Sequence, residues 1–555
     1  MSDDVRTLAD EYYDFKAANG PTGAHMRGDY RFADQFEQIS RVHEDATIAA
    51  LREFTRRADE LDPATMTAAE QVTRDVLVYA STSGADVAAT RLAEFAVDPT
   101  FGTHVSIPIF MPRLTVNTPD LADAMVSKVS AMGAYFDEAT ERVREGLENK
   151  RLPVQFAVAR VLEQLDELIE HPADGHPFTM VNAPDSFDEP QESAYRAALA
   201  TALTDDVIPA LVRQRDVIRD EIAPVARLDE NAGLSWLPDG ASTYARAIER
   251  FTTLEMQAEE IHQIGRMEID RLGDEYREIA GPLFDTTDLA EIYAQLREDP
   301  ELHHENGPDV ITASEVAFDR ARGEMPKWFN IMPESDCVVR PIESGPIAFY
   351  YPPADDGSRP GTFFMNVADP TAWARYQVEA TAYHEGIPGH HLQIAIAQEL
   401  GDVVPRFQRE AFIAAYGEGW GLYTERLADE MGLYSSQLDR VGMLAADSMR
   451  ASRLVVDTGI HALGWSREKG VEYFATNSPM SLHQIREEVD RYVTMPGQAL
   501  SYMIGRLEIQ RMRRDAETAL GDLFDIKAFH DTVLGSGLMP LGTLDRVVRE
   551  WVTSQ

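Results

Sequence analysis

The chain has 555 residues, of which 44% are hydrophobic and 26% charged, a composition that excludes global disorder and allows more than one core. Its formal net charge of −43 excludes a nucleic-acid backbone or an anionic membrane as the main partner, because both are themselves negative. Cys337 is the only cysteine, which excludes an intrachain disulfide and a cysteine-rich zinc site. Any metal must therefore be bound by His, Asp or Glu.

The start of the chain, MSDDVRTLADEYYDF, is acidic and lacks the basic region and apolar run of an export signal. No later segment reaches 18 uninterrupted apolar residues. We therefore expect a protein without a membrane-spanning segment, located in the cytoplasm.

Apolar residues recur at spacings of three and four over much of the chain, for example over residues 121–148 and 244–272. This periodicity is typical of amphipathic helices, so we predict a mainly α fold. Stretches rich in Pro, Asp and Gly interrupt the pattern at residues 172–190 and 224–240. We take the second as a boundary between an N-terminal helical lobe, residues 1–230, and a catalytic lobe, residues 231–555.

Residues 337–367 are the main candidate for a sheet, because β-branched and aromatic residues cluster there between turn signals. The segment lies just before a group of histidines. We expect a small sheet next to a metal-bearing helix, with an exposed edge strand near residues 349–367 able to hold an extended peptide.

The segment HEGIPGHH, residues 384–391, places three imidazoles and a carboxylate within eight positions, although the chain has only 14 histidines. In an HExxH helix, two histidines four positions apart reach one zinc, and the adjacent glutamate holds the attacking water. Here the fourth position is Pro388, which cannot donate an amide hydrogen, and Gly389 follows it. We therefore expect a bulge in place of a regular helix.

The second histidine ligand depends on this bulge. If two residues are extruded, His390 takes the place of the fourth position after His384. The alternative is His391, but its Cα would lie roughly 10 Å from that of His384 in a straight helix. We favour His390. A lone histidine beside a proline is more often structural, but the cluster favours metal binding.

A third ligand is expected, because a catalytic zinc has three protein ligands and one open position. Glu418 follows 28 positions after His390 in YGEGWGLYTERLADEMGLY and shares a helical face with Glu425, which we expect to support a ligating imidazole. A solvated helix face is the alternative for both acids. Three glycines alternate here: Gly417, Gly419 and Gly421. Because glycine is unfavourable in a helix unless the backbone must approach a neighbour closely, they argue against a solvated face.

The strings LPDGASTYARAIERFTTLEMQAEEIHQIG, HEGIPGHHLQ, YGEGWGLYTERLADEMGLY, RLVVDTGIHALGWSREKGVEYF, EVDRYVTMPGQALSYMIGRLEI and FHDTVLGSGLMPL resemble the bacterial domain-of-unknown-function 885 family of the zincin peptidase clan. Within that clan, the thimet-oligopeptidase-like and carboxypeptidase Taq-like families are similar. The resemblance implies a large, two-lobed helical body. It also implies His384, His390 and Glu418 as zinc ligands and Glu385 as the general base. The family's lipoproteins carry an export signal that this chain lacks, so we expect a different location.

A donor to the developing oxyanion is usually a later Tyr or His, and the candidates are Tyr492, Tyr502 and His461. Each is about equally well explained as a core residue. Arg491 is a candidate clamp for a peptide carboxylate, although an ordinary helix ion pair explains it almost as well.

The sequence thus predicts a Zn²⁺-dependent hydrolase of short peptides, of oligopeptidase or carboxypeptidase type. In this mechanism Glu385 is the general base and a zinc-activated water is the nucleophile. One alternative is a non-haem iron oxygenase, which also uses two histidines and a carboxylate. A second is a catalytically silent peptide-binding relative. Internal or terminal cleavage and the oligomeric state stay open.

Overall fold

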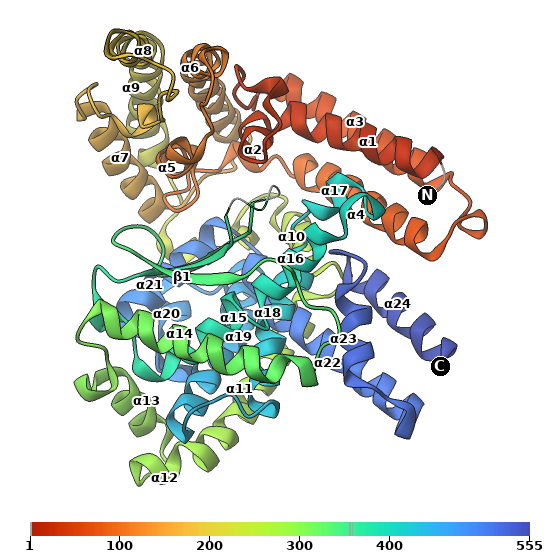
Figure 1. The fold of residues 1–555 in the computed structure, drawn as a ribbon. Coiled ribbons are helices and arrows are strands. Elements are labelled where there is room, and N and C mark those ends of the chain that lie inside the picture. Colours follow the sequence, from red (N-terminus) through yellow and green to blue (C-terminus); the bar gives the residue numbers. More distant parts are fainter. Residues whose placement is uncertain (1–2, 355–356, 358) are drawn as a thin grey trace.

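The computed structural model describes residues 3–354, 357 and 359–555, and it is built mainly of helices (Figure 1). Within these residues there is one sheet, of three short strands. The mainly α prediction is confirmed.

The N-terminal part consists of helices whose apolar faces turn toward one another. The predicted helix over residues 121–148 is α6, which begins after Thr118, whose side chain accepts a hydrogen bond from the Leu121 amide. The longer helices of this part are α1 (Asp3–Asn19), α3 (Arg41–Asp59), α4 (Ala68–Ala89), α6 (Pro119–Glu148), α7 (Gln155–Glu170), α8 (Glu189–Ala202) and α9 (Ile208–Val217).

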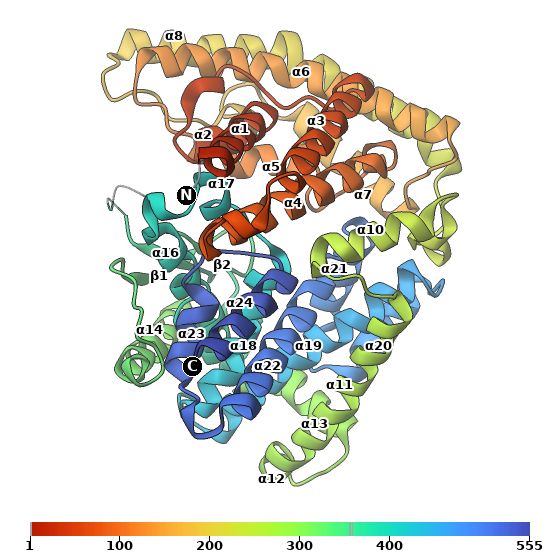
Figure 2. The ribbon, with the colours of Figure 1, turned by 90° about the vertical axis from the view of Figure 1, so that its right-hand side faces the viewer.

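These helices contribute to two separate hydrophobic cores. The core around α6 to α9, with Phe136 and Phe178 at its centre, draws only on residues 36–226. In contrast, α1, α3 and α4 share a core with helices from the end of the chain, and Figure 2 shows α4 near the C-terminal helix α24 (Leu541–Ser554). Arg546 of α24 reaches Asp75 of α4 at 2.7 Å. Packing therefore crosses the expected boundary near residue 230. The division into two lobes at that residue stays a prediction.

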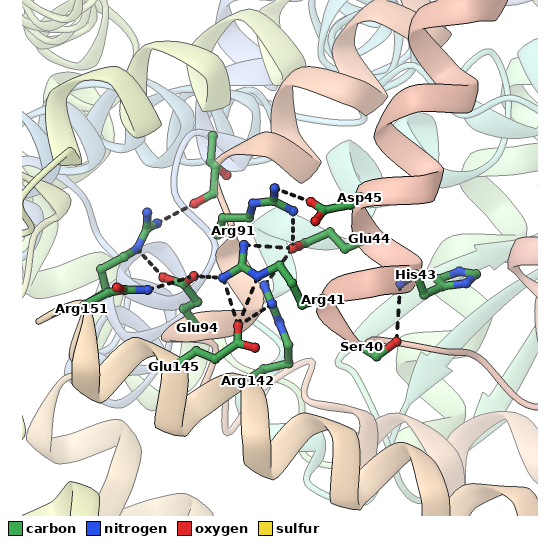
Figure 3. A network of polar contacts seen from close by, with 12 residues as sticks. Ser40, Arg41, His43, Glu44, Asp45, Arg91, Glu94, Arg142, Glu145 and Arg151 are labelled. Atoms are coloured by element: carbon green, nitrogen blue, oxygen red, sulfur yellow. Dashed lines mark hydrogen bonds and ion pairs between the residues drawn. The ribbon is translucent and has the colours of Figure 1, made fainter.

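A network of ion pairs joins α3, α6 and the short helix η3 (Leu92–Glu94) (Figure 3). Arg41 pairs with Glu94 and, at 2.8 Å, with Glu145, while Arg142 reaches Glu44 at 2.7 Å. Arg142 is only 1% exposed. Because a buried guanidinium without a partner is strongly destabilising, this network holds the three elements in one arrangement.

The C-terminal part is a helical body around α18 and α19. The pattern over residues 244–272 forms two helices, because the chain turns at Thr253, which has a φ of 62°. The longer helices are α10 (Gly240–Thr252), α11 (Ala258–Ile279), α13 (Leu289–Glu298), α14 (Gly307–Glu324), α15 (Val378–Glu385), α16 (His390–Glu399), α18 (Ala414–Glu430), α19 (Gln437–His461), α20 (Arg467–Asn477), α21 (Leu482–Thr494), α22 (Ser501–Leu520) and α23 (Ile526–Leu534).

The sheet lies within the predicted segment and confirms that prediction. Its strands are β1 (Cys337–Ile342), β2 (Ala348–Tyr351) and β3 (Gly361–Asn366), in the order β1-β3-β2. Strand β1 is parallel to β3, and β2 is antiparallel to it, with Phe349 opposite Phe364. Strand β2 is therefore an edge strand, but β3, which also falls within the expected edge segment 349–367, is the central strand. The next α-helices after the sheet carry the histidines.

Candidate metal centre

The HEGIPGHH segment is broken between α15 and α16, as its Pro388 predicts. The first helix ends at Glu385, and the second begins at His390. The amide of His391 donates to the carbonyl oxygen of Gly386 at 3.0 Å. At Gly389 a Cβ would lie 1.9 Å from the carbonyl oxygen of His384, so the chain folds back tightly here. The break brings His390 next to His384.

His384, His390 and Glu418 form a cluster of candidate ligands whose donor atoms lie within 4.8 Å of one another. The Nε2 atoms of His384 and His390 are 3.5 and 3.4 Å from Oε2 of Glu418. Ligand atoms about 2 Å from a tetrahedral zinc are separated by about 3.3 Å. The spacing and the two-imidazole, one-carboxylate donor set therefore fit a zinc ion.

Glu425 supports His384 from the same helix that carries Glu418. Its Oε1 is 2.8 Å from Nδ1 of His384, so in the neutral imidazole that a metal requires Nδ1 carries the hydrogen and the Nε2 lone pair faces the cluster. Between the two acids, a Cβ at Gly421 would lie 2.7 Å from Cε1 of His384. Gly421 is therefore the position at which α18 approaches the candidate ligand His384 closely.

The cluster is electrostatically suited to a cation. Burial lowers the pKa of His384, but the carboxylates of Glu418 and Glu425 outweigh burial and raise it to about 9. For Glu418, burial raises the pKa, but the two histidines hold it well below its usual range. A site that favours an extra positive charge between these groups also favours a divalent metal ion.

His391, the alternative second ligand, points away from the cluster. Its Nε2 lies 3.0 Å from the carbonyl oxygen of Ser335 and must carry the hydrogen, because a carbonyl can only accept. Its Nδ1 therefore accepts from the hydroxyl of Tyr350, at 2.9 Å. Both ring nitrogens are engaged, which favours His390 as the ligand.

The cluster lies in the wall of a cavity of about 880 Å³. Glu385, next to His384 in sequence, lines the same cavity, as do residues 345–350 of the β2 edge. Tyr502 also lines it, with its ring stacked at 6.4 Å from that of His384. Of the three oxyanion candidates, Tyr502 is the one that the structure brings to the cluster.

Tyr492, His461 and Arg491 are not among the residues that line the cavity. Tyr492 donates its hydroxyl to Glu488, and His461 is held between the amide of Leu234 and the carbonyl oxygen of Tyr492. Arg491 donates to Glu488 at 2.9 Å and to Gln498. Internal partners account for all three side chains, so we assign them no direct part in the chemistry.

Two arginines that sequence reasoning missed, Arg450 and Arg453 of α19, do line the cavity, together with Glu488 of α21. Their signal in the sequence is two positive charges three positions apart, in a helix where buried residues run from Val441 to His461. Charges at helical spacing on a mostly buried helix mark a polar face that meets another polar group or a ligand.

Comparisons with solved structures find the same fold over nearly the whole chain. A crystal structure of a candidate lipoprotein from Colwellia psychrerythraea is 25% identical, covers 99% of each chain and has a TM-score of 0.91. A candidate lipoprotein of unknown function from Shewanella oneidensis is 16% identical, with a TM-score of 0.75 over 99% of this chain and 100% of that one.

No curated protein matches the chain. Within the residues that the structure describes, no helix combines the length and the apolar composition needed to span a bilayer. The profile of the family described as "Bacterial protein of unknown function (DUF885)" matches residues 21–548. The chain therefore belongs to the DUF885 family of bacterial proteins.

Proposed function

We propose that the chain is a zinc-dependent peptidase that hydrolyses short peptides. The observation that carries this proposal is the convergence of His384, His390 and Glu418 on the wall of a cavity that Glu385 also lines. Two imidazoles and one carboxylate leave a zinc ion with an open coordination position, which is the arrangement of catalytic sites.

Glu385 is the proposed general base. A zinc ion held by His384, His390 and Glu418 would lower the pKa of its water and polarise the carbonyl of the scissile bond. The carboxylate of Glu385 accepts the proton of that water and delivers it to the leaving amine. Its position directly after His384 places base and ligand on one short helix.

Tyr502 is the proposed donor to the oxygen on which negative charge develops. Burial, together with the charge of Glu418, raises the pKa of Tyr502, so its hydroxyl keeps its hydrogen at neutral pH. A protonated hydroxyl beside the ligands can donate a hydrogen bond that strengthens as the charge forms.

Strand β2 supports the choice of a peptide as substrate. The amide of Asn366 donates to the carbonyl oxygen of Ile347, so by antiparallel alternation Phe349 and Tyr351 pair with β3. The backbone groups of Ala348 and Tyr350 then face the other side of the strand. An extended peptide can add to this edge along the cavity wall.

An iron oxygenase would use the same three ligands, but it needs no carboxylate beside the first histidine. A silent relative would bind zinc without turnover. Metal analysis of the purified chain, combined with mass spectrometry of a mixed peptide library, separates the three. One zinc per chain with peptide cleavage supports the proposal. Iron favours the oxygenase, and zinc without cleavage favours the silent relative.

A further inference from the structure

Arg453 of α19 has a side-chain donor that no other described residue accepts from. Its Nη2 donates to Oε2 of Glu488 at 2.8 Å, and its Nε donates to the hydroxyl of Tyr492 at 3.0 Å. The side chain is 6% exposed and lines the cavity. Its Nη1 is buried and has no hydrogen-bond partner among the described residues. A buried donor of a charged group in a cavity wall is suited to a ligand oxygen.

Arg450 lies one helical turn earlier and lines the same cavity. Its Nη2 is 3.7 Å from Oε1 of Glu425, too far for a hydrogen bond. Its Nε, like Nη1 of Arg453, is buried without a partner among the described residues. The two guanidinium groups lie 5.7 and 4.4 Å from the ring centre of Tyr502, which itself stacks on His384. Both arginines are therefore close to the candidate metal centre.

At the α19–α21 end of the cavity three guanidinium groups share two carboxylates, although the cavity is also lined by Asp369, Glu385, Glu418 and Glu487. Arg453 and Arg491 both pair with one carboxylate, that of Glu488, and Arg450 has only the distant Glu425, which is hydrogen-bonded to His384. Because an unsatisfied donor of a buried charged group is unfavourable, this end of the cavity is complementary to one singly charged anionic group.

We propose that Arg450 and Arg453 bind a carboxylate of the peptide substrate. This assignment rests on the proposed peptidase function, because it takes the cavity as the place where the peptide lies. A carboxylate has two oxygens for the two unused donors and carries a single charge. A doubly charged phosphate would be repelled by the nearby Glu385, Glu418 and Glu488. The carboxylate can belong to the C-terminus, which implies carboxypeptidase-type cleavage, or to an acidic side chain.

Binding is measured by calorimetry in the zinc-loaded Glu385→Gln chain, so that turnover does not interfere. The probes are N-acetyl-trialanine with a free C-terminus and the same peptide as the amide. A second pair of amidated peptides differs only in Glu against Gln at one position. The variants Arg450→Gln and Arg453→Lys are added to the same background. Arg440→Gln is the matched control, because Arg440 lies on α19 but pairs with Asp429.

In at least one of the two peptide pairs, we expect the peptide with the carboxylate to bind about tenfold tighter than its neutral counterpart, as for a charge-assisted contact. Each cavity variant should remove most of this preference, and Arg440→Gln should keep it. Glu488→Gln should increase it, because a competing carboxylate is lost. The pair that responds identifies the source of the carboxylate.

The proposal is overturned if neither acid binds better than its neutral partner, or if the cavity variants weaken acid and neutral peptides equally. Failure of the carboxylate site can be told apart from failure of the peptidase proposal. Cleavage of acid and amide peptides at equal rates by the unmodified chain would keep the peptidase and reject the carboxylate site. A binding preference without any cleavage would keep the carboxylate site and reject the peptidase.

Discussion

Tyr350 donates its hydroxyl hydrogen to Nδ1 of His391, at 2.9 Å, and so ties the edge strand β2 to the helix that begins with His390. A Cβ at Gly361 would lie 2.4 Å from the same nitrogen, so the neighbouring strand has room only for glycine. The adjacent histidines thus have different environments. His390 faces the candidate metal centre, and His391 positions the strand that we propose binds the peptide.

The first prediction separates these two histidines. His390→Ala should lose zinc during dialysis, because it removes a ligand, whereas His391→Ala should keep about one zinc per chain. The metal content of both purified variants, measured by mass spectrometry, checks this. Retention of zinc by His390→Ala together with its loss from His391→Ala would reverse the assignment.

The second prediction concerns Gly421. In Gly421→Ala the new Cβ would lie 2.7 Å from Cε1 of His384 and would displace the ring. We expect zinc affinity to fall by about tenfold or more, as for changes beside a ligand, in a chelator competition assay. Gly417→Ala is the control on the same helix, because its Cβ meets only the half-exposed ring of Phe412 and should leave affinity unchanged. Normal affinity in Gly421→Ala would contradict the packing argument.

Local chemistry made much of the site predictable. Pro388 cannot continue a helix, so the break that brings His390 to His384 follows from the sequence. Glu418 and Glu425 are seven positions apart, about two turns, and therefore lie on one face of α18. The periodicity over residues 121–148 likewise predicted α6.

The rest depends on how helices pack, which a single sequence does not encode locally. Tyr502 reaches the cavity and Tyr492 does not, because α19, α21 and α22 meet at angles that residue spacing does not specify. The same packing buries Arg453 beside the cavity, although an arginine in a helix is usually solvated. His461 looked like a catalytic candidate but is held by backbone groups on both sides.

The third prediction is a pH dependence of stability that arises from His461. Burial lowers its pKa to about 4 in the folded protein, against about 6.5 unfolded, so the unfolded state binds more protons between these values. The contribution of neutral His461 is therefore full above pH 6.5 and is lost as the pH falls toward 4, by roughly 3 kcal/mol.

Urea unfolding at pH 7 and pH 4.5 checks this by comparing the wild type with His461→Gln, which cannot be protonated. The variant should be less stable at pH 7, because it fits the two backbone partners less well, and the difference should shrink at pH 4.5. A stability difference that does not change with pH would show that His461 does not titrate in this range.

The fourth prediction concerns the size of the substrate. A cavity of about 880 Å³ accepts a few residues of extended chain beside β2 but not a folded domain. We expect a short peptide to be cleaved faster than the same sequence within a stably folded protein, when both are incubated side by side and followed by mass spectrometry. Equal cleavage of the two would refute the enclosed-site interpretation.

The central claim is that Glu385 is the base of a zinc-dependent peptidase, and Glu385→Gln tests it most directly. The amide keeps the shape of the side chain but cannot accept a proton from water. The measurement is turnover of a mixed peptide library by the zinc-loaded wild type and variant, with the zinc content of each determined in the same samples. We predict equal zinc in both, cleavage by the wild type, and a loss of at least about a hundredfold in the variant. Near-normal cleavage by Glu385→Gln, or no cleavage by a fully zinc-loaded wild type, would contradict the account.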